Sequence, residues 1–510
     1  SSLSINSLNV RNVRYLSRTL LNTRTTESRY STMSNPTNLL NKESFNKNVR
    51  LVALKIPAKA CSEYMTKFAA ESYIRPKTKK VYEAPGEPMH RLLLLAEKHQ
   101  DLNLSNLPKE LKEFNEKHGG TTQEFILNLS YEHLGIDEVL RRILPAEVKE
   151  IPSAFEQAGH LAHLNLRDEA LPYKHLIAQV LLDKNPSIKT VVNKIGNIET
   201  EFRTFPMELL AGLDDYEVTL KESHAKFTFN FAQVYWNSRL QMEHARLIDI
   251  IQKAAGYKTT EHPKLKGKTS AQLPLNVSYP NNNNKGVKKP PLVVADMMAG
   301  VGPFAVPLAM PVVNNSTSTT TWEREIIVHA NDLNPASFKY LEVNGRNNHC
   351  STRRLRNYNM CGREFILKLV AENVPFHHAI MNLPQNATDF LDVFIGLHTR
   401  IGADKLAVWG ELPRIHVYAF STHESDPIGD IVRRSATVLR CSASSLYPGL
   451  ADEGRHYEGP VAQCAGHIVR DVAPKKVMVC LSFLLPKVVA DAVPLDFASK
   501  KRHAEEAGLN

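Results

Sequence analysis

Residues 292–304 read Leu-Val-Val-Ala-Asp-Met-Met-Ala-Gly-Val-Gly-Pro-Phe, and this stretch decides the expected fold. Its first four residues form a continuous apolar run, which is typical of a parallel strand buried on both faces. The run ends in an acid, Asp296, and a turn containing Gly300 and Gly302 follows, which lets the backbone approach a bound ligand closely. An ordinary tight turn would use the same glycines, and a dinucleotide fingerprint would need a third glycine where Ala305 stands.

A second apolar run, residues 326–331, leads into Asp-Leu-Asn-Pro at 332–335. A carboxylate at the tip of the second strand commonly binds the hydroxyls of a ribose, so Asp332 is a candidate for that role. Asp332 could instead cap the helix that the following Asn-Pro pair begins.

A further apolar run, residues 378–382, which we interpret as the fourth strand, ends in Asn382 and is followed by Leu383 and Pro384. The Asn side chain both donates and accepts hydrogen bonds, so it can match the edge of a purine base. Asn and Pro also favour plain turns, so this motif alone would be ambiguous. Three polar sites in this order, each at the carboxyl end of a strand, are far more specific than any one of them.

Strand and helix patterns alternate through this part of the chain, which predicts a doubly wound α/β sheet. Further strands are expected at 414–420 and 477–485, and helices at 335–347, 387–398 and 428–439. We place this domain at residues 290–500. Polar stretches at 264–291 and 314–321 indicate linkers or surface insertions. A third stretch, 421–466, is rich in Gly, Ser and Pro with scattered charge, and the sequence does not define its role.

Two smaller α+β domains are predicted upstream. The first, at 45–145, should contain amphipathic helices at 107–117 and 122–144. The second, at 150–260, should contain a strand at 156–166, a helix at 176–184, short strands at 190–193, 202–210, 217–220 and 226–230, and a helix at 240–255 with one apolar face.

The composition narrows the class of protein. The net charge of +10 is compatible with a polyanionic partner. No apolar run approaches the roughly 18 residues that a membrane helix needs, so we expect no membrane contact. The six cysteines show neither a CxxC pair nor zinc spacing, so we expect free thiols and no metal.

Residues 1–32 hold five arginines and one acid and are rich in Ser, Asn and Leu. This composition is typical of a mitochondrial presequence, although a basic tail without a targeting role would look similar. Met33 could serve as a second start that omits the presequence.

Four further motifs resemble the tRNA (guanine-37 N1)-methyltransferases of eukaryotes and archaea, which are class I methyltransferases. They are His-Leu-Asn-Leu-Arg-Asp-Glu at 163–169, Asn-Lys-Ile at 193–195, Phe-Arg-Thr-Phe-Pro-Met-Glu-Leu-Leu-Ala-Gly at 202–212, and Val-Tyr-Trp-Asn-Ser-Arg-Leu-Gln-Met-Glu-His at 234–244. The resemblance extends over about residues 45–500. It also covers the glycine turn, which resembles motif I of class I methyltransferases.

The resemblance implies S-adenosylmethionine as cofactor and a tRNA with guanosine at position 37 as substrate, with the first domain helping to read the tRNA. It assigns Glu243 as the general base for the N1 proton, Arg203 as support for charge on guanine O6, and Asn382 as the group that holds the base. The base site would also include Tyr235 and Pro384. The cofactor site would be lined by His244, Asp296, Ala299, Gly300, Gly302, Asp332, Leu333, Cys361, Gly362 and Asn382. Taken alone, Glu243 and His244 could simply open a helix, and Arg203 could form a surface ion pair.

One position departs from the family pattern. The third cofactor strand of the family ends in Asn-x-Asp-Gly-Arg, whose acid contacts the adenine amino group, whereas residues 359–363 read Asn-Met-Cys-Gly-Arg. A thiol is a poor acceptor, so Cys361 should weaken cofactor binding by about 1–2 kcal/mol.

Two other functions remain open on the sequence. A related enzyme of wybutosine synthesis transfers an aminocarboxypropyl group and removes no N1 proton, so the matches at Arg203 and Glu243 argue against it. A non-catalytic RNA-binding protein would not need the intact set Asp296, Gly300, Gly302, Asp332 and Asn382. We further expect a monomer that works in the mitochondrial matrix, with nuclear and cytoplasmic pools implied by the resemblance.

Overall fold

The computed structural model of the protein describes residues 40–99, 101–196, 202–256, 290–311, 324–447 and 464–497. The chain divides into two compact units, Ser1–Val139 and Leu140–Asn510. The presequence expected at 1–32, Met33 and the polar stretch 314–321 lie outside the described residues, as does 264–291 except for its last two residues.

The first unit contains a four-stranded antiparallel sheet in the order β2-β3-β1-β4. Its central strand β1 alternates buried side chains between two apolar clusters, with Leu51 and Ala53 in one and Val52, Leu54 and Ile56 in the other, so both faces of the sheet are covered. The strands are β1 (Lys47–Pro57), β2 (Val81–Glu83), β3 (His90–Leu94) and β4 (Thr121–Leu129). The helices are α1 (Cys61–Lys67) and α2 (Lys109–Lys117), with short 3-10 turns at Lys42–Phe45, Ala58–Ala60, Ala69–Glu71 and Tyr131–His133.

The helix predicted at 122–144 is wrong over its first half. Residues Thr121–Leu129 form strand β4, which pairs with β1 from Lys47↔Leu129 to Lys55↔Thr121. Leu127 and Leu129 are buried while the residues beside them are exposed, a period of two that the sequence reading missed. A helix, α3 (Ile136–Ile143), occupies only the end of the predicted range.

The second unit begins with a four-stranded sheet in the order β5-β6-β7-β8, in which only β6 and β7 run parallel. The strand predicted at 156–166 is a hairpin of two short strands, because Gly159 adopts a φ of +56° and turns the chain. The elements are β5 (Glu156–Ala158), β6 (Leu161–Leu164), a 3-10 turn (Leu171–Tyr173), α4 (Lys174–Lys184), β7 (Thr190–Lys194) and β8 (Met207–Gly212).

The hairpin of β9 (Glu217–Glu222) and β10 (Ala225–Asn230) is fastened to helix α7 (Pro335–Asn347). The Thr228 N–H donates to Asn344 Oδ1 and the Lys226 N–H to Asn348 Oδ1, both at 2.8 Å. Asn348 also donates back to the Lys226 carbonyl at 2.7 Å. Two buried side-chain amides thus bind the backbone groups that an edge strand leaves free.

A seven-stranded sheet in the order β13-β12-β11-β14-β15-β17-β16 carries the rest of the unit. The first five strands in this order are parallel to their neighbours, and β17 and β16 are antiparallel additions at one edge. The strands are β11 (Leu292–Asp296), β12 (Ile326–Asn331), β13 (Leu355–Tyr358), β14 (His378–Met381), β15 (Arg414–Ser421), β16 (Cys464–Ala473) and β17 (Lys476–Leu484). The predicted doubly wound α/β fold is confirmed.

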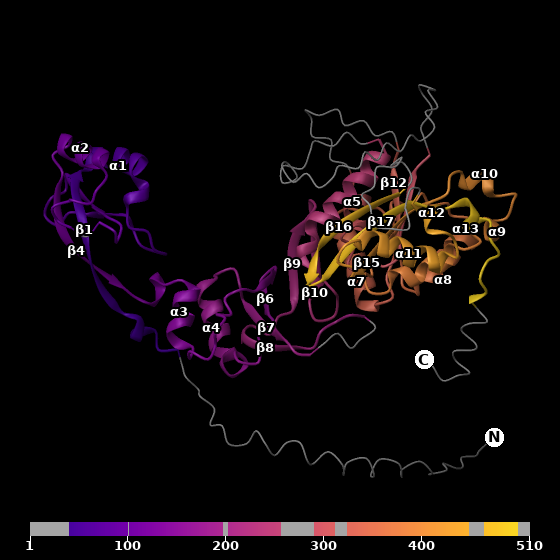
Figure 1. The fold of residues 1–510 in the computed structure, drawn as a ribbon, viewed down its shortest axis with the longest axis horizontal. Helices are drawn as coiled ribbons and strands as arrows, with labels where there is room; N and C mark the ends of the chain where they lie inside the picture. Colours follow the sequence, from indigo (N-terminus) through magenta and orange to yellow (C-terminus); the bar gives the residue numbers. More distant parts are fainter. Residues whose placement is uncertain are drawn as a thin grey trace, which may run out of the picture. The chain divides into compact units, whose positions relative to one another are not determined.

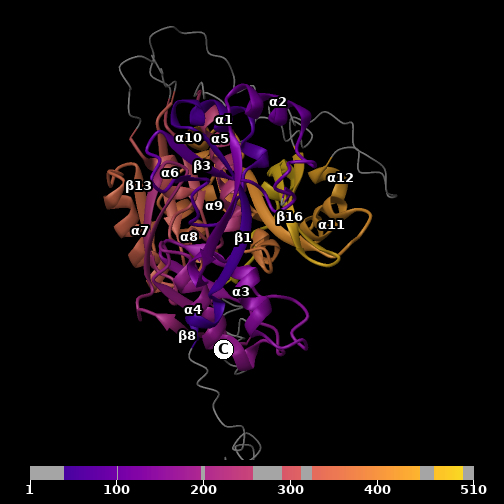
Figure 2. The ribbon, with the colours of Figure 1, turned by 90° about the vertical axis from the view of Figure 1, so that its left-hand side faces the viewer.

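Helices cover both faces of this sheet (Figure 1), and Figure 2 shows β13 with α7 and β16 with α11 and α12 at its opposite edges. One face packs against β9, β10, α5 (Gln241–Ala254), α6 (Ala305–Ala309) and α7, with Phe227, Phe229 and Leu247 among the buried side chains. The other face packs mainly against α8 (Gly362–Ala371), the 3-10 helix Ala387–Phe394 and α11 (Pro427–Leu439). The remaining helices are the 3-10 turn Ser238–Leu240, α9 (Leu397–Ile401), α10 (Leu406–Trp409), α12 (Ala443–Leu446) and α13 (Lys487–Ala490).

The regions predicted as separate domains at 150–260 and 290–500 therefore share one apolar core. Helix 387–398 is mostly 3-10 rather than α, and the stretch 421–466 contains α11, α12 and the start of β16. All six cysteines are unpaired thiols. Among the described residues, no helix combines the length and apolar character needed to cross a bilayer, and no cluster of His, Cys, Asp and Glu is arranged to hold a metal ion.

Candidate active site

The glycine turn after β11 brings together most of the residues predicted to bind the cofactor. Gly300 has a φ of +55° and its N–H donates to Asp332 Oδ2 at 2.8 Å. Gly302 has a φ of +97°, and a Cβ there would lie 2.6 Å from Val306 Cγ2 and 2.7 Å from Leu341 Cδ1. Both glycines are therefore required by conformation, and the second also by the close packing of α6 and α7 behind the turn.

Asp332 shapes the turn and does not cap the following helix. Its Oδ1 accepts from the Asn334 N–H at 2.9 Å, while Asn334 itself caps α7 by accepting from the Ala336 N–H. The capping role considered for Asp332 is therefore wrong. Burial raises the pKa of this carboxyl, and the Asn334 and Gly300 N–H groups oppose the rise. Leu333 beside it is 42% exposed, so it forms an open rim of the same turn.

Asp296 is fully buried at the end of β11. Burial raises its pKa well above the ordinary value, and the neighbouring Asp332 adds to the rise. The Met298 N–H lowers the pKa but does not cancel this rise. Neither oxygen has a well-formed hydrogen bond within the described part of the chain. A buried carboxylate without donors is costly unless a ligand supplies them, so Asp296 is a candidate for binding a donor group.

A residue that sequence reasoning missed holds three strand ends together. The buried Asn331 donates from Nδ2 to the carbonyls of Met297 at 3.0 Å and Met360 at 2.9 Å, and its Oδ1 accepts from the Met360 N–H. Cys361 follows as the N-cap of α8, without a side-chain capping bond, and Gly362 begins the helix. A polar residue closing an apolar strand run was the pattern that could have identified Asn331.

Arg203 lies beside the loop that follows β14. It has a φ of +57°, and its Nη2 donates to Asn386 Oδ1 at 3.5 Å, four residues beyond Asn382. Burial lowers the pKa of Arg203, and the nearby Tyr235, 43% exposed, opposes this. Asn382 Oδ1 is buried without a hydrogen-bond donor among the described residues. The structure thus brings Arg203 and Tyr235 from the upstream region to the Asn382 loop.

Glu243 lies in the first turn of α5 and faces the seven-stranded sheet. Arg246 binds its carboxylate with Nε and Nη2 at 2.7 and 2.6 Å, and the Tyr418 hydroxyl of β15 donates to Oε1 at 2.8 Å. His467 Nε2 of β16 lies 3.4 Å from Oε2. Burial alone would raise the pKa of Glu243, but Arg246 and His467 outweigh it and hold the pKa at about 2. A helix-opening acid with no other role would not be buried and bound in this way.

His244 points into the core from the next position of α5. Its Nδ1 hydrogen-bonds to the buried Glu222 at 2.5 Å, and its ring packs edge-on against Phe304 at 4.8 Å between centroids. Phe304 ends the glycine turn, so His244 contacts that turn from behind. Arg246, Tyr418 and His467 had not been predicted as site residues, and only Arg246 shows a pattern in the sequence, the i,i+3 spacing from an acid on a helix.

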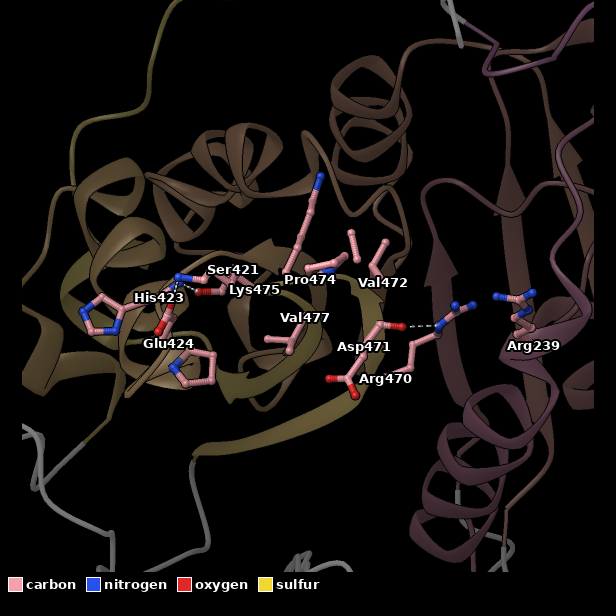
Figure 3. Close-up of a pocket in the computed structure, with 13 residues that line it drawn as sticks. Arg239, Ser421, His423, Glu424, Arg470, Asp471, Val472, Pro474, Lys475 and Val477 are labelled. Carbon is pink, nitrogen blue, oxygen red and sulfur yellow. Dashed lines mark hydrogen bonds and ion pairs between the residues drawn. The ribbon is translucent and has the colours of Figure 1, made fainter. Parts of the chain in front are cut away.

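A basic cavity of about 620 Å³ lies along the same strands, between the end of β15 and the tip of the β16–β17 hairpin (Figure 3). Four cations line it against two acids, and the guanidinium groups of Arg239 and Arg470 point toward each other. The cations are Arg239, Arg470, Lys475 and Lys476, and the acids are Glu424 and Asp471. Such a lining suits phosphate groups.

The sheet order, the glycine turn and the paired strand-end acids define an α/β methyltransferase domain. The family model described as "TRM5/TYW2 methyltransferase domain" matches residues 284–403, and that described as "TYW2 N-terminal domain" matches 136–215. A tRNA (guanine(37)-N(1))-methyltransferase of Phytophthora infestans is 39% identical over 90% of this chain and 94% of its own length. The human tRNA (guanine(37)-N(1))-methyltransferase is 32% identical over 88% and 76%. The chain therefore belongs to the tRNA (guanine(37)-N(1))-methyltransferase family.

A solved structure, wild-type Trm5b from Pyrococcus abyssi, has the same fold with a TM-score of 0.51. The two chains are 19% identical, and the alignment covers 85% of this chain and 99% of the other.

Proposed function

We propose that the protein transfers a methyl group from S-adenosylmethionine to N1 of guanosine 37 in tRNA. The observation that carries this is Glu243, a buried and ionised carboxylate that Tyr418 fixes to the strand next to β14. Guanine N1 carries a proton that has to leave as the nitrogen is methylated, so a carboxylate near the base is the chemical requirement. The names of the relatives at 32–39% identity support this reaction.

The residues fit S-adenosylmethionine, which when bound supplies a methyl group on a positively charged sulfur that keeps the bonding electron pair. Asp296 would accept from the ammonium group, since its buried oxygens have no well-formed hydrogen bond among the described residues. Asp332 would bind the ribose, because its carboxylate can accept a further hydrogen bond besides those from Gly300, Asn334 and Ser337. The missing Cβ of Gly302 keeps the turn tight behind the cofactor.

The protein's own residues would position the base and remove the proton. Asn382, whose buried Oδ1 has no donor within the described residues, would accept from the guanine edge. Arg203, bound to Asn386, would stabilise negative charge on O6. Positioning of this kind supplies much of the rate in a direct displacement.

The reaction is tested by methyl transfer to two tRNA transcripts that differ only in G or A at position 37. We expect labelled methyl on the G transcript alone, and mass spectrometry of the nucleosides should identify 1-methylguanosine. An aminocarboxypropyl product, which adds a much larger mass, would establish the wybutosine-type reaction instead. Cofactor binding without turnover on either transcript would leave a non-catalytic RNA-binding protein.

The basic cavity at the β16–β17 tip is where we propose that tRNA phosphates bind. Lys475 pairs with Glu424 at 2.7 Å and Arg239 with Glu156 at 2.6 Å, so each cation is oriented and still more than half exposed. Arg470→Gln and Lys475→Gln should each lower affinity for all tRNAs alike and reduce the slope of log K against log salt by about 1. Arg433→Gln, an exposed residue outside the cavity lining, is the matched control. An unchanged slope would exclude this cavity as a phosphate site.

We also propose mitochondrial import through residues 1–32, with nuclear and cytoplasmic pools of the form starting at Met33, and a monomeric enzyme. Fusion of residues 1–32 to a fluorescent protein tests import, and light scattering of the enzyme tests its mass. Diffuse fluorescence in the cell would refute the import proposal.

A further inference from the structure

The carboxylate of Glu243 is enclosed by three side chains from two structural layers. Arg246 of α5 binds both oxygens, Tyr418 of β15 donates to Oε1, and His467 of β16 approaches Oε2. The Glu243 side chain is only 4% exposed, so these three side chains are the groups in contact with its carboxylate to which a proton could pass.

Only one of these partners can take the proton and release it. Arg246 is a permanent cation and accepts none. Tyr418 is fully buried and already donates its proton to Glu243, and burial raises the pKa of Tyr418 further. Cys480, next to them on β17, is also fully buried, and burial raises its pKa to about 11. The His467 side chain is 23% exposed, and an imidazole ring can both accept and donate a proton.

The sheet register explains how His467 reaches this position. His467 of β16 pairs with Cys480 of β17, and Cys480 pairs with Tyr418 of β15, so the three side chains form one row on the face that α5 covers. β16 is the edge strand of the sheet, which places the end of the row at the solvent. The edge strand therefore connects a buried carboxylate to water through one imidazole.

Resting on the proposed function, we propose that His467 is a proton-relay residue. The N1 proton passes to Glu243 Oε2 as the methyl–nitrogen bond forms and the methyl–sulfur bond breaks, with the electron pair of the broken bond left on sulfur. The proton then passes from Oε2 to an unprotonated Nε2 of His467, and the resulting imidazolium releases a proton to bulk water. Glu243 returns to its ionised form and no electron changes hands. Because Arg246 favours the ionised carboxylate, Glu243 is a weak base that holds the proton poorly, and His467 completes its removal.

The test compares His467→Gln with His349→Gln, an exposed histidine just after α7 that belongs to neither the Glu243 row nor the basic cavity lining. Single-turnover methyl transfer at saturating cofactor and tRNA should be about 10- to 100-fold slower in His467→Gln, with KM for tRNA and cofactor affinity within twofold of wild type. The pH dependence of the rate should change in His467→Gln and be retained in His349→Gln.

A second variant separates proton transfer from packing. His467→Ala should regain rate when imidazole is added, and more at pH 8 than at pH 6, because only the neutral form accepts a proton. An unchanged rate and profile in His467→Gln, or no imidazole rescue of His467→Ala, would overturn the relay. A wild-type enzyme that does not methylate G37 would instead refute the proposed function.

Discussion

Asp296 and Glu243 are both buried carboxylates of the second unit, but their surroundings are opposite. Asp296 has no well-formed hydrogen bond within the described residues, and burial raises its pKa well above the ordinary value. Glu243 is bound by Arg246 and Tyr418, and its pKa is held at about 2 despite burial. Burial alone does not decide the charge of a carboxylate, because the donors around it can reverse the effect. The surroundings of Glu243 keep its carboxylate charged, whereas those of Asp296 lack the hydrogen-bond donors that a ligand would bring.

The strongest test of this comparison is to remove the negative charge of Glu243. Glu243→Gln should slow methyl transfer by roughly 10²- to 10⁴-fold, the usual contribution of a positioned base. Cofactor affinity, measured by calorimetry, should stay within a few-fold of wild type and would also show that the variant is folded. The exposed Glu411→Gln is the control. Full activity in Glu243→Gln would break the comparison, since both carboxylates would then lack a role in proton transfer.

The pH dependence of stability provides a second test of the difference between Glu243 and Asp296. The folded pKa of Glu243, about 2, lies below the ordinary 4.5, so the ionised group stabilises the fold above pH 4.5. That stabilisation should be lost as the pH falls from about 4.5 toward 2. At pH 7, Glu243→Gln should therefore lower the free energy of unfolding by up to roughly 3 kcal/mol.

Urea unfolding at pH 7, 5.5, 4.5 and 4 would follow this difference, which should begin to narrow below pH 4.5. A difference that grows toward acid pH would contradict the ion-pair account of Glu243.

Asp296→Asn should act in the opposite direction on stability. Because the folded pKa of Asp296 is raised, its ionised form destabilises the fold at high pH and the penalty is absent below the ordinary pKa. The ligand-free variant should unfold about 2–4 °C higher than wild type at pH 8, with no gain at acid pH. Its affinity for S-adenosylmethionine should fall about 10- to 100-fold, the value of a hydrogen bond to a charged group. A destabilised variant with unchanged affinity would show that Asp296 is structural.

Cys361→Asp is expected to have the smallest effect, a gain in cofactor affinity of about 1–2 kcal/mol from one added hydrogen bond. Cys361 is also the N-cap of α8, where Asp would stabilise the helix in any protein. Cys361→Ser is therefore the control, because Ser also caps a helix but adds no charge. Equal gains in affinity for Ser and Asp would attribute the effect to the cap.

The sequence predicted β11, β12, β14 and β15 of the parallel core, because buried parallel strands read as apolar runs that stand out locally. β13 was not predicted as an apolar run, since only its first residue, Leu355, is buried. Ile326–Asn331 and Pro335–Asn347 match the structure residue for residue. Edge strands were harder, and β16 was not predicted because only its first two residues are buried. β4 was misread as helix because its alternation is interrupted by polar residues.

The candidate site was predictable where a motif lies at the end of a strand, as at Gly300 and Asp332. The neighbours of Glu243 were not, because they are defined by strand pairing across the sheet. Tyr418 is 175 residues away in the chain, and nothing near it in the sequence marks it as a partner. Resemblance to a family could name Glu243, but only the register of β15, β16 and β17 reveals what surrounds it.

The hydrogen bonds between the side-chain amides of α7 and the backbone of β10 limit where the protein can be truncated. Asn344 and Asn348 bind the backbone of β10, and Phe227 and Phe229 lie in the same core as the sheet. A fragment starting at residue 290 would carry the glycine turn but would expose this apolar face to water. The shortest expressible fragment that retains the site therefore has to start before Arg203. The boundary between the two units falls inside α3, so the most natural place to cut the gene is just before Ile136.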